Sequence, residues 1–249
     1  MIEALKLFDS YNRQARLYPA LLALLPLIVT AWASLPESGR GLGGTIFGLL
    51  AMSGGLFLLA EIARASGKAL EPRLLASWGG WPTTRLLRHS DQNLPVLTKQ
   101  RYCNVLASKT AMTWPTEAAE RADAESADQV YRAATDWLRQ QTRGTEFSLL
   151  LSENASYGFR RNMLGLKTWA MVIAVVCALI SCASVAYHAA DSRQLMSAIL
   201  QPANRPQLGA AAFSIVALVG WMFVVTSSWV KAASETYAAA LLACCDRLP

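Results

Sequence analysis

Four apolar runs, each about as long as a lipid bilayer is thick, constrain the fold of this chain more than any other feature of its sequence. They cover residues 17–35, 42–63, 164–186 and 208–230. A helix needs about 20 predominantly apolar residues to cross the hydrocarbon core of a membrane, and each run has that length. The composition agrees, because 53% of the residues are hydrophobic and only 16% are charged, whereas about a quarter are charged in soluble domains. The sequence therefore predicts an all-α integral membrane protein with four transmembrane helices.

The connections between these runs indicate two hairpins with a folded domain between them. Residues 36–40 form a tight, polar connection, and the second outer loop is a modest turn. About a hundred residues lie between the second and third runs, which is enough for a small domain. We expect an N-terminal amphipathic helix and first hairpin over 1–63, a helical cytosolic domain over 64–163, and a second hairpin with a short cytosolic tail over 164–249.

The distribution of lysine and arginine predicts the orientation of the chain. The N-terminal flank, the 64–163 region and the C-terminal flank carry 3, 14 and 2 of them, and the two outer loops carry 1 and 2. Because cytoplasmic loops of membrane proteins carry an excess of these cations, both termini and the central domain are expected in the cytoplasm. We expect an inner-membrane protein with this orientation.

A basic, aromatic segment over residues 64–109 is the strongest candidate for a binding surface. It holds eight lysines and arginines and two acids, a local net charge of +6. One interpretation is the ordinary excess of cations beside a membrane span. The other is a surface that binds phosphates and stacks bases, because flat rings alternate with guanidinium groups along it. The phosphate-contacting candidates are Arg73, Arg85, Arg88, Lys99, Arg101 and Lys109, and the base-stacking candidates are Trp78, Trp81 and Tyr102.

The residues that follow this segment are acidic and helical in pattern. Residues 110–157 hold eight acids and four arginines, so they balance much of the basic charge. Apolar residues at helical spacing predict one or two amphipathic helices over 116–142, ending before Gly144. Within the basic segment, Gly79, Gly80 and Pro82 predict a turn between two helical pieces.

The sequence lacks the motifs of familiar enzymes and metal sites. It contains no GxxxxGK[ST], HExxH or GxSxG pattern. Its five cysteines form no CxxC pair, and its two histidines are far apart in the sequence, so we expect no metal, no cofactor and no enzyme. A coupled carrier is also disfavoured, because no acid lies in the middle of an apolar run. A pore built from several copies needs no such acid, and residues 42–63 and 208–230 are the runs expected to line it.

Three motifs carry a resemblance to a known group of proteins. The chain resembles a family of four-span bacterial membrane proteins encoded beside nucleotidyltransferases, and it is similar to the membrane effector of the Hailong anti-phage system. The resemblance covers the layout of hairpin, soluble domain and hairpin over nearly the whole chain. Its motifs are Trp78-Gly79-Gly80-Trp81-Pro82-Thr83-Thr84-Arg85-Leu86-Leu87-Arg88-His89, Thr98-Lys99-Gln100-Arg101-Tyr102 and Tyr157-Gly158-Phe159-Arg160-Arg161-Asn162.

The resemblance implies an antiviral channel that causes abortive infection. It implies a homo-oligomer, a tetramer, kept closed by DNA oligomers that the partner nucleotidyltransferase makes and that bind a ring of basic residues. Loss of the DNA would open the pore and depolarise the membrane. Two alternatives remain: a membrane effector opened by a cyclic nucleotide, and a non-conducting anchor that recruits a cytosolic partner.

Overall fold

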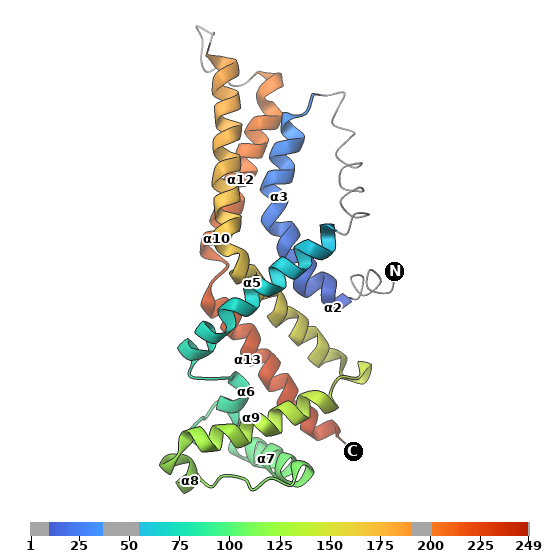
Figure 1. Ribbon diagram of the computed structural model, residues 1–249, viewed down its shortest axis with the longest axis vertical. Coiled ribbons are helices and arrows are strands. Elements are labelled where there is room, and N and C mark those ends of the chain that lie inside the picture. Colours follow the sequence, from blue (N-terminus) through green and yellow to red (C-terminus); the bar gives the residue numbers. More distant parts are fainter. Residues whose placement is uncertain (1–9, 37–54, 191–200, 249) are drawn as a thin grey trace. The chain divides into compact units, whose positions relative to one another are not determined.

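The computed structural model describes residues 10–36, 55–190 and 201–248 (Figure 1). Over these residues the chain forms helices, turns and loops and no β-strand, so the predicted all-α class is confirmed for them. The chain divides into two compact units. We call residues 1–69 with 158–227 the apolar unit, and residues 70–157 with 228–249 the polar unit.

Within the described residues, three helices are long and apolar enough to cross a membrane. They span Arg13–Ser34, Thr145–Ala189 and Pro202–Phe223, and they include the third predicted run and most of the first and fourth. The second predicted run, 42–63, lies mostly outside the described residues; its end belongs to α5, Gly55–Trp78. The chain is therefore described as a protein with three candidate membrane-spanning helices.

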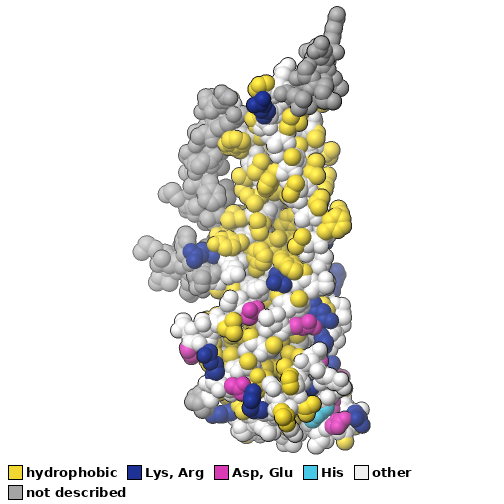
Figure 2. All heavy atoms as spheres, turned by 180° about the vertical axis from the view of Figure 1, so that it is seen from behind, with side chains coloured by type: hydrophobic (Ala, Val, Ile, Leu, Met, Phe, Trp, Pro, Cys, Tyr) yellow, Lys and Arg dark blue, Asp and Glu magenta, His cyan; other side chains and the backbone are white. Residues whose placement is uncertain are grey.

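Within the apolar unit, the first and last of these helices pack side by side. The first comprises a π-helical turn, η1 (Arg13–Leu17), followed by α3 (Tyr18–Ser34), and α3 packs against α12 (Arg205–Phe223). The amide of Gln207 donates a 3.2 Å hydrogen bond to the Ser34 hydroxyl. Large apolar side chains are exposed along α3, α10 (Ser148–Ala189) and α12, as on helices whose outer surface faces lipid (Figure 2).

A crossing of α5 and α10 brings two helix backbones into direct contact. A Cβ built on Gly165 would lie 2.5 Å from the backbone nitrogen of Gly67, so only glycine fits there. Asn162, one turn before Gly165, is 1% exposed and donates a 2.6 Å hydrogen bond to the carbonyl of Ala15. Small residues at a helix interface permit this close approach.

The fourth predicted run does not form one helix, which corrects that part of the prediction. α12 ends at Phe223, and α13 (Ser227–Ala243) begins after residues 224–226. No proline causes this break. Instead, the ammonium of Lys167 donates to the carbonyl oxygens of Met222 (3.0 Å) and Val225 (2.7 Å), which would otherwise lack a partner at the end of a helix.

The polar unit consists mainly of short helices around an apolar core. Thr116 and Asp123 cap α8 and α9 by accepting hydrogen bonds from backbone N–H groups, as expected for these residue types. The helices predicted over 116–142 are confirmed as this pair. The further elements of the unit, besides parts of α5 and α10, are α6 (Pro82–Leu87), α7 (Val96–Thr110), α8 (Glu117–Ala122), α9 (Ala124–Gln141), η3 (Thr145–Phe147), α13 and η5 (Cys244–Arg247).

The core of the polar unit includes the C-terminal tail of the chain. Leu106 of α7, Tyr131 and Leu138 of α9, and Leu241 and Leu242 of α13 are all fully buried in it. The sequence predicted only a short cytosolic tail after the second hairpin. In the structure this tail forms α13 and η5, and their apolar side chains complete the core of the polar unit. No local sequence pattern in the tail predicted this role.

Candidate ligand pocket in the polar unit

The predicted turn at the glycine pair is confirmed and positions the first candidate residues. α5 ends at Trp78, Gly79 and Gly80 follow with φ of 76° and 108°, and α6 begins at Pro82. Positive φ is accessible to glycine at little cost, which explains the helix end at this pair.

The three base-stacking candidates do not form an open aromatic surface. Trp78 is only 7% exposed and Tyr102 only 6%, and the Tyr102 ring belongs to the apolar core of the unit. Trp81 is half-buried, and the guanidinium of Arg132 lies 5.9 Å from the centre of its ring. A base could stack on Trp78 or Tyr102 only after neighbouring side chains had moved away.

The phosphate candidates at the end of α6 and the start of α7 already have partners. Both Arg88 nitrogens that face Asp128 donate to its carboxylate, with Nε 2.8 Å from Oδ1. This pairing raises the pKa of Arg88 although burial opposes it. The ammonium of Lys99 donates to the carbonyl oxygens of Arg88 (2.6 Å) and Asp91. These two cations fasten the loop 88–95 onto α7 and α9.

The remaining candidates lie at the surface of the unit. Arg101 pairs with Asp246 of η5 at 2.9 Å. Arg73 on α5 and Lys109 at the end of α7 are exposed.

Counted over its whole sequence, the polar unit holds twelve lysines and arginines and twelve acids, so its net charge is zero. Residues 70–109, the part of the basic segment in this unit, carry six cations and two acids, and their net charge of +4 is cancelled by the net charge of −4 over 110–157.

Glu120 is the acid that fixes the turn after Arg88. It is 7% exposed, and it accepts hydrogen bonds from the backbone N–H groups of His89 (2.8 Å) and Ser90 (3.3 Å) and from the Tyr131 hydroxyl (2.7 Å). Burial opposes ionisation of this carboxyl, but the three donors outweigh it, and the pKa of Glu120 is lowered. Burial, together with the hydrogen bond to the Glu120 carboxylate, raises the pKa of Tyr131.

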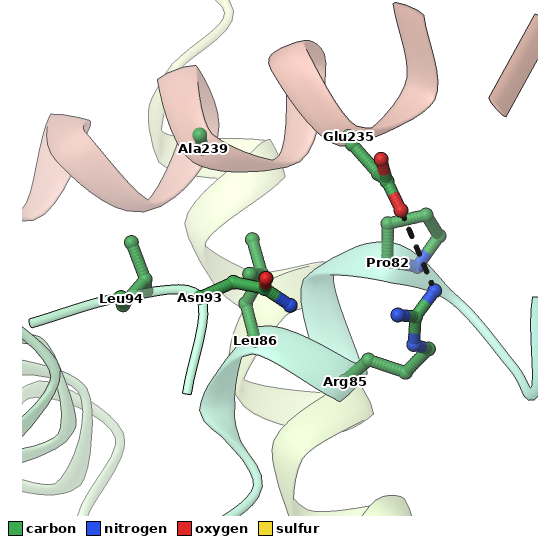
Figure 3. A pocket seen from close by; sticks show the side chains of 7 residues that line it. All are labelled: Pro82, Arg85, Leu86, Asn93, Leu94, Glu235 and Ala239. Carbon is green, nitrogen blue, oxygen red and sulfur yellow. Dashed lines mark ion pairs between the residues drawn. The ribbon is translucent and has the colours of Figure 1, made fainter. Parts of the chain in front are cut away.

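A pocket of about 220 Å³ lies between α6, the loop before α7, and α13. Figure 3 shows the Arg85 guanidinium and the Glu235 carboxylate facing one another at one side, with the Asn93 amide beside them. Leu94 and Ala239 lie at the other side, next to the Asn93 loop and on α13. The pocket therefore combines a cation, an anion, an amide and apolar walls.

Arg85, the phosphate candidate in this pocket, is held by a long ion pair. Its Nη1 lies 3.6 Å from Oε1 of Glu235, which is an ion pair but beyond a good hydrogen bond. Nη1 is buried and makes no hydrogen bond within the described part of the chain. Glu235 is shared with Lys231, whose ammonium lies 3.8 Å away. A ligand with a phosphate or carboxylate oxygen would satisfy Arg85 better than Glu235 does.

The three cysteines of the polar unit offer no reactive thiol. Burial raises the pKa of Cys103 to about 11, that of Cys245 to about 12, and also that of Cys244, so all three are thiols at neutral pH. Among the described residues, no group of three or more histidines, cysteines or acids could hold a metal ion.

Sequence reasoning found Arg85 but missed the residues that surround it. Glu235 lies 150 positions further along the chain in a segment interpreted as a tail, and Asn93 lies in a loop without a motif. Only their contact with α6 reveals them. No family model, no curated protein and no solved structure matches this chain, so the resemblance to anti-phage membrane effectors stays a prediction.

Proposed function

We propose that the protein is a ligand-gated membrane effector, a homo-oligomeric pore controlled by a phosphate-bearing ligand that binds at Arg85. The observation that carries this proposal is the Arg85–Glu235 pair in the pocket of the polar unit. Glu235 belongs to α13, the helix that follows the last candidate span after the break at 224–226. A ligand that replaces Glu235 as the partner of Arg85 would act directly on this helix.

The physical basis is competition between two anions for one guanidinium. Arginine binds phosphate in a two-point arrangement that a carboxylate 3.6 Å away does not supply. Glu235 would then keep Lys231 as its partner, one turn earlier on the same helix. Gating requires only that the ligand bind one arrangement of α13 better than the other.

The size of the pocket restricts the ligand. About 220 Å³ is below the roughly 300 Å³ at which pockets enclose whole drug-sized molecules. It fits a phosphate group with part of its sugar or base, so either a nucleotide or the end of a DNA oligomer could enter. The net charge of zero on the polar unit favours such a local contact over a broad polyanion surface.

The biological setting follows from the sequence-based resemblance. In it, four helices of each subunit span a bacterial inner membrane, with both termini and the polar unit in the cytoplasm. The subunits form a tetramer, and a neighbouring nucleotidyltransferase makes the DNA oligomer that keeps the pore closed. Its loss during infection would open the pore and stop growth.

Ligand binding and ion flux test this proposal on the full-length protein. Arg85→Gln should weaken binding of a short DNA oligomer or a nucleotide by about ten- to a hundredfold, because one charge-assisted contact is lost. Arg121→Gln is the matched control, since Arg121 is exposed and pairs only locally with Glu117. In liposomes, ligand should change the flux through the parent protein and the control but not through Arg85→Gln. Equal affinity of all three proteins would refute the site.

A second function, a non-conducting membrane anchor, is favoured by a different observation. Arg88, Lys99 and Arg101 are engaged within the polar unit, and the unit carries no net charge. Such a unit could recruit a cytosolic protein without binding nucleic acid. Liposomes separate the two functions, because an anchor conducts no ions with or without any nucleotide or DNA.

A further inference from the structure

A second pocket lies in the apolar unit, at the start of the first candidate span. It has a volume of about 360 Å³ and is lined by Arg13, Gln14, Tyr18 and Phe159. Arg13, Gln14 and Tyr18 come from the first span and its leading turn, and Phe159 comes from α10. Arg13 and Gln14 are exposed, and Tyr18 is 47% exposed, so their polar groups are accessible.

A π-helical turn lies at the side of the pocket that Arg13, Gln14 and Tyr18 form. Residues Arg13–Leu17 form a π-helical turn, and the N–H of Tyr18 bonds to the carbonyl of Arg13, five residues before it. This spacing aligns residue 18 with residue 13 along the helix. The guanidinium and the phenol ring therefore border the same pocket, and single π-helical turns of this kind are frequent at functional sites.

The electrostatics around this pocket favour an anion. The apolar unit holds eleven lysines and arginines and five acids, so it carries the whole net charge of +6. Within the described residues of the apolar unit the only acid is Glu61, and it is paired with Arg16 (3.4 Å) and Arg64 (3.2 Å). The other cations of this group are Lys68, Arg160, Arg161 and Lys167.

The depth of the pocket points to a lipid. It lies where a helix long enough to cross a bilayer begins, and the first turn of such a helix is expected at the level of the lipid headgroups. Tyrosine and arginine are typical of this level, because each has an apolar body and a polar tip. We propose that the pocket binds the headgroup of an anionic phospholipid, with Arg13, Gln14 and the Tyr18 hydroxyl donating to its phosphate and Phe159 packing against its glycerol.

Lipid binding to the full-length protein in detergent tests this inference. We expect phosphatidylglycerol, counted by native mass spectrometry, to bind more tightly than phosphatidylcholine. Arg13→Gln should weaken phosphatidylglycerol binding about five- to tenfold, because one cation near the membrane surface is lost. Tyr18→Phe, which keeps the ring, should weaken it by a smaller factor.

Arg205→Gln is the matched control. Arg205 is also an exposed arginine of the apolar unit, but it begins α12, whose Gln207 contacts Ser34 at the opposite end of α3. Arg13 lies just before the first residue of α3, whereas Arg205 lies near its last residues. α3 has 17 residues and is therefore about 25 Å long, so the two arginines are well separated. Unchanged phosphatidylglycerol binding by Arg13→Gln would overturn the proposal. Displacement of the lipid by inorganic phosphate would overturn it too, in favour of a soluble anion site.

Discussion

Replacing Gly165 with alanine should weaken the helix crossing of the apolar unit. The new Cβ would lie 2.5 Å from the backbone nitrogen of Gly67 and 2.5 Å from the backbone carbon of Ser66, whereas ordinary contacts begin at 3.4 Å. Both atoms belong to the backbone, so no side chain can rotate away. The two helices must therefore part by about 0.9 Å at this point.

Two opposing contributions determine the change in the free energy of unfolding. Overpacking a tight contact costs about 1–3 kcal/mol, and alanine is about 1 kcal/mol better than glycine inside a helix. Gly220→Ala is the matched control, because Gly220 lies in α12 with no atom within 4 Å of the position of its Cβ. It receives the helical gain without the clash. The two variants should therefore differ by about 1–3 kcal/mol, with Gly165→Ala the less stable.

Thermal unfolding in one detergent measures this difference. For a chain of this size 1 kcal/mol corresponds to about 2–4 °C, so Tm of Gly165→Ala should lie roughly 2–12 °C below that of Gly220→Ala. Tryptophan fluorescence reports the transition, because the chain has eight tryptophans. Equal Tm values for the two variants would refute the contact between α5 and α10.

Two further substitutions test the polar unit and the break before α13. The lowered pKa of Glu120 means that its ionised form stabilises the fold at neutral pH and that this contribution is lost as the pH falls through the folded-state pKa; Glu120→Gln should lower Tm at pH 7 and make Tm less dependent on pH below about 4.5. Parallel pH curves for variant and parent would contradict this. Lys167→Met removes both donors to the carbonyls of residues 222 and 225 and should cost about 1–3 kcal/mol in thermal unfolding. Lys68→Met, at an exposed position of the same unit, is the control and should leave Tm unchanged. If both variants lowered Tm equally, the proposed capping role of Lys167 would be refuted.

The local features of the fold were predictable from the sequence. Apolar runs of about 20 residues identified the three described candidate spans, because length and hydropathy alone decide whether a helix can cross a bilayer. Gly79 and Gly80 ended α5, since φ is positive at both. The periodic apolar residues over 116–142 gave α8 and α9 for an equally local reason, the 3.6-residue repeat of a helix.

Only the tertiary structure decided which charges meet and what closes the core. Arg85 meets Glu235 and Arg101 meets Asp246 across about 150 residues of chain. The part of the basic segment over 70–109, with a net charge of +4, belongs to a polar unit whose net charge is zero. At the break after Phe223, two backbone carbonyls likewise accept hydrogen bonds from Lys167 of another helix. Composition and periodicity predict the local secondary structure that neighbouring residues favour. Pairing and closure depend on residues that the fold alone brings together, and the candidate pocket at Arg85 is made of such residues.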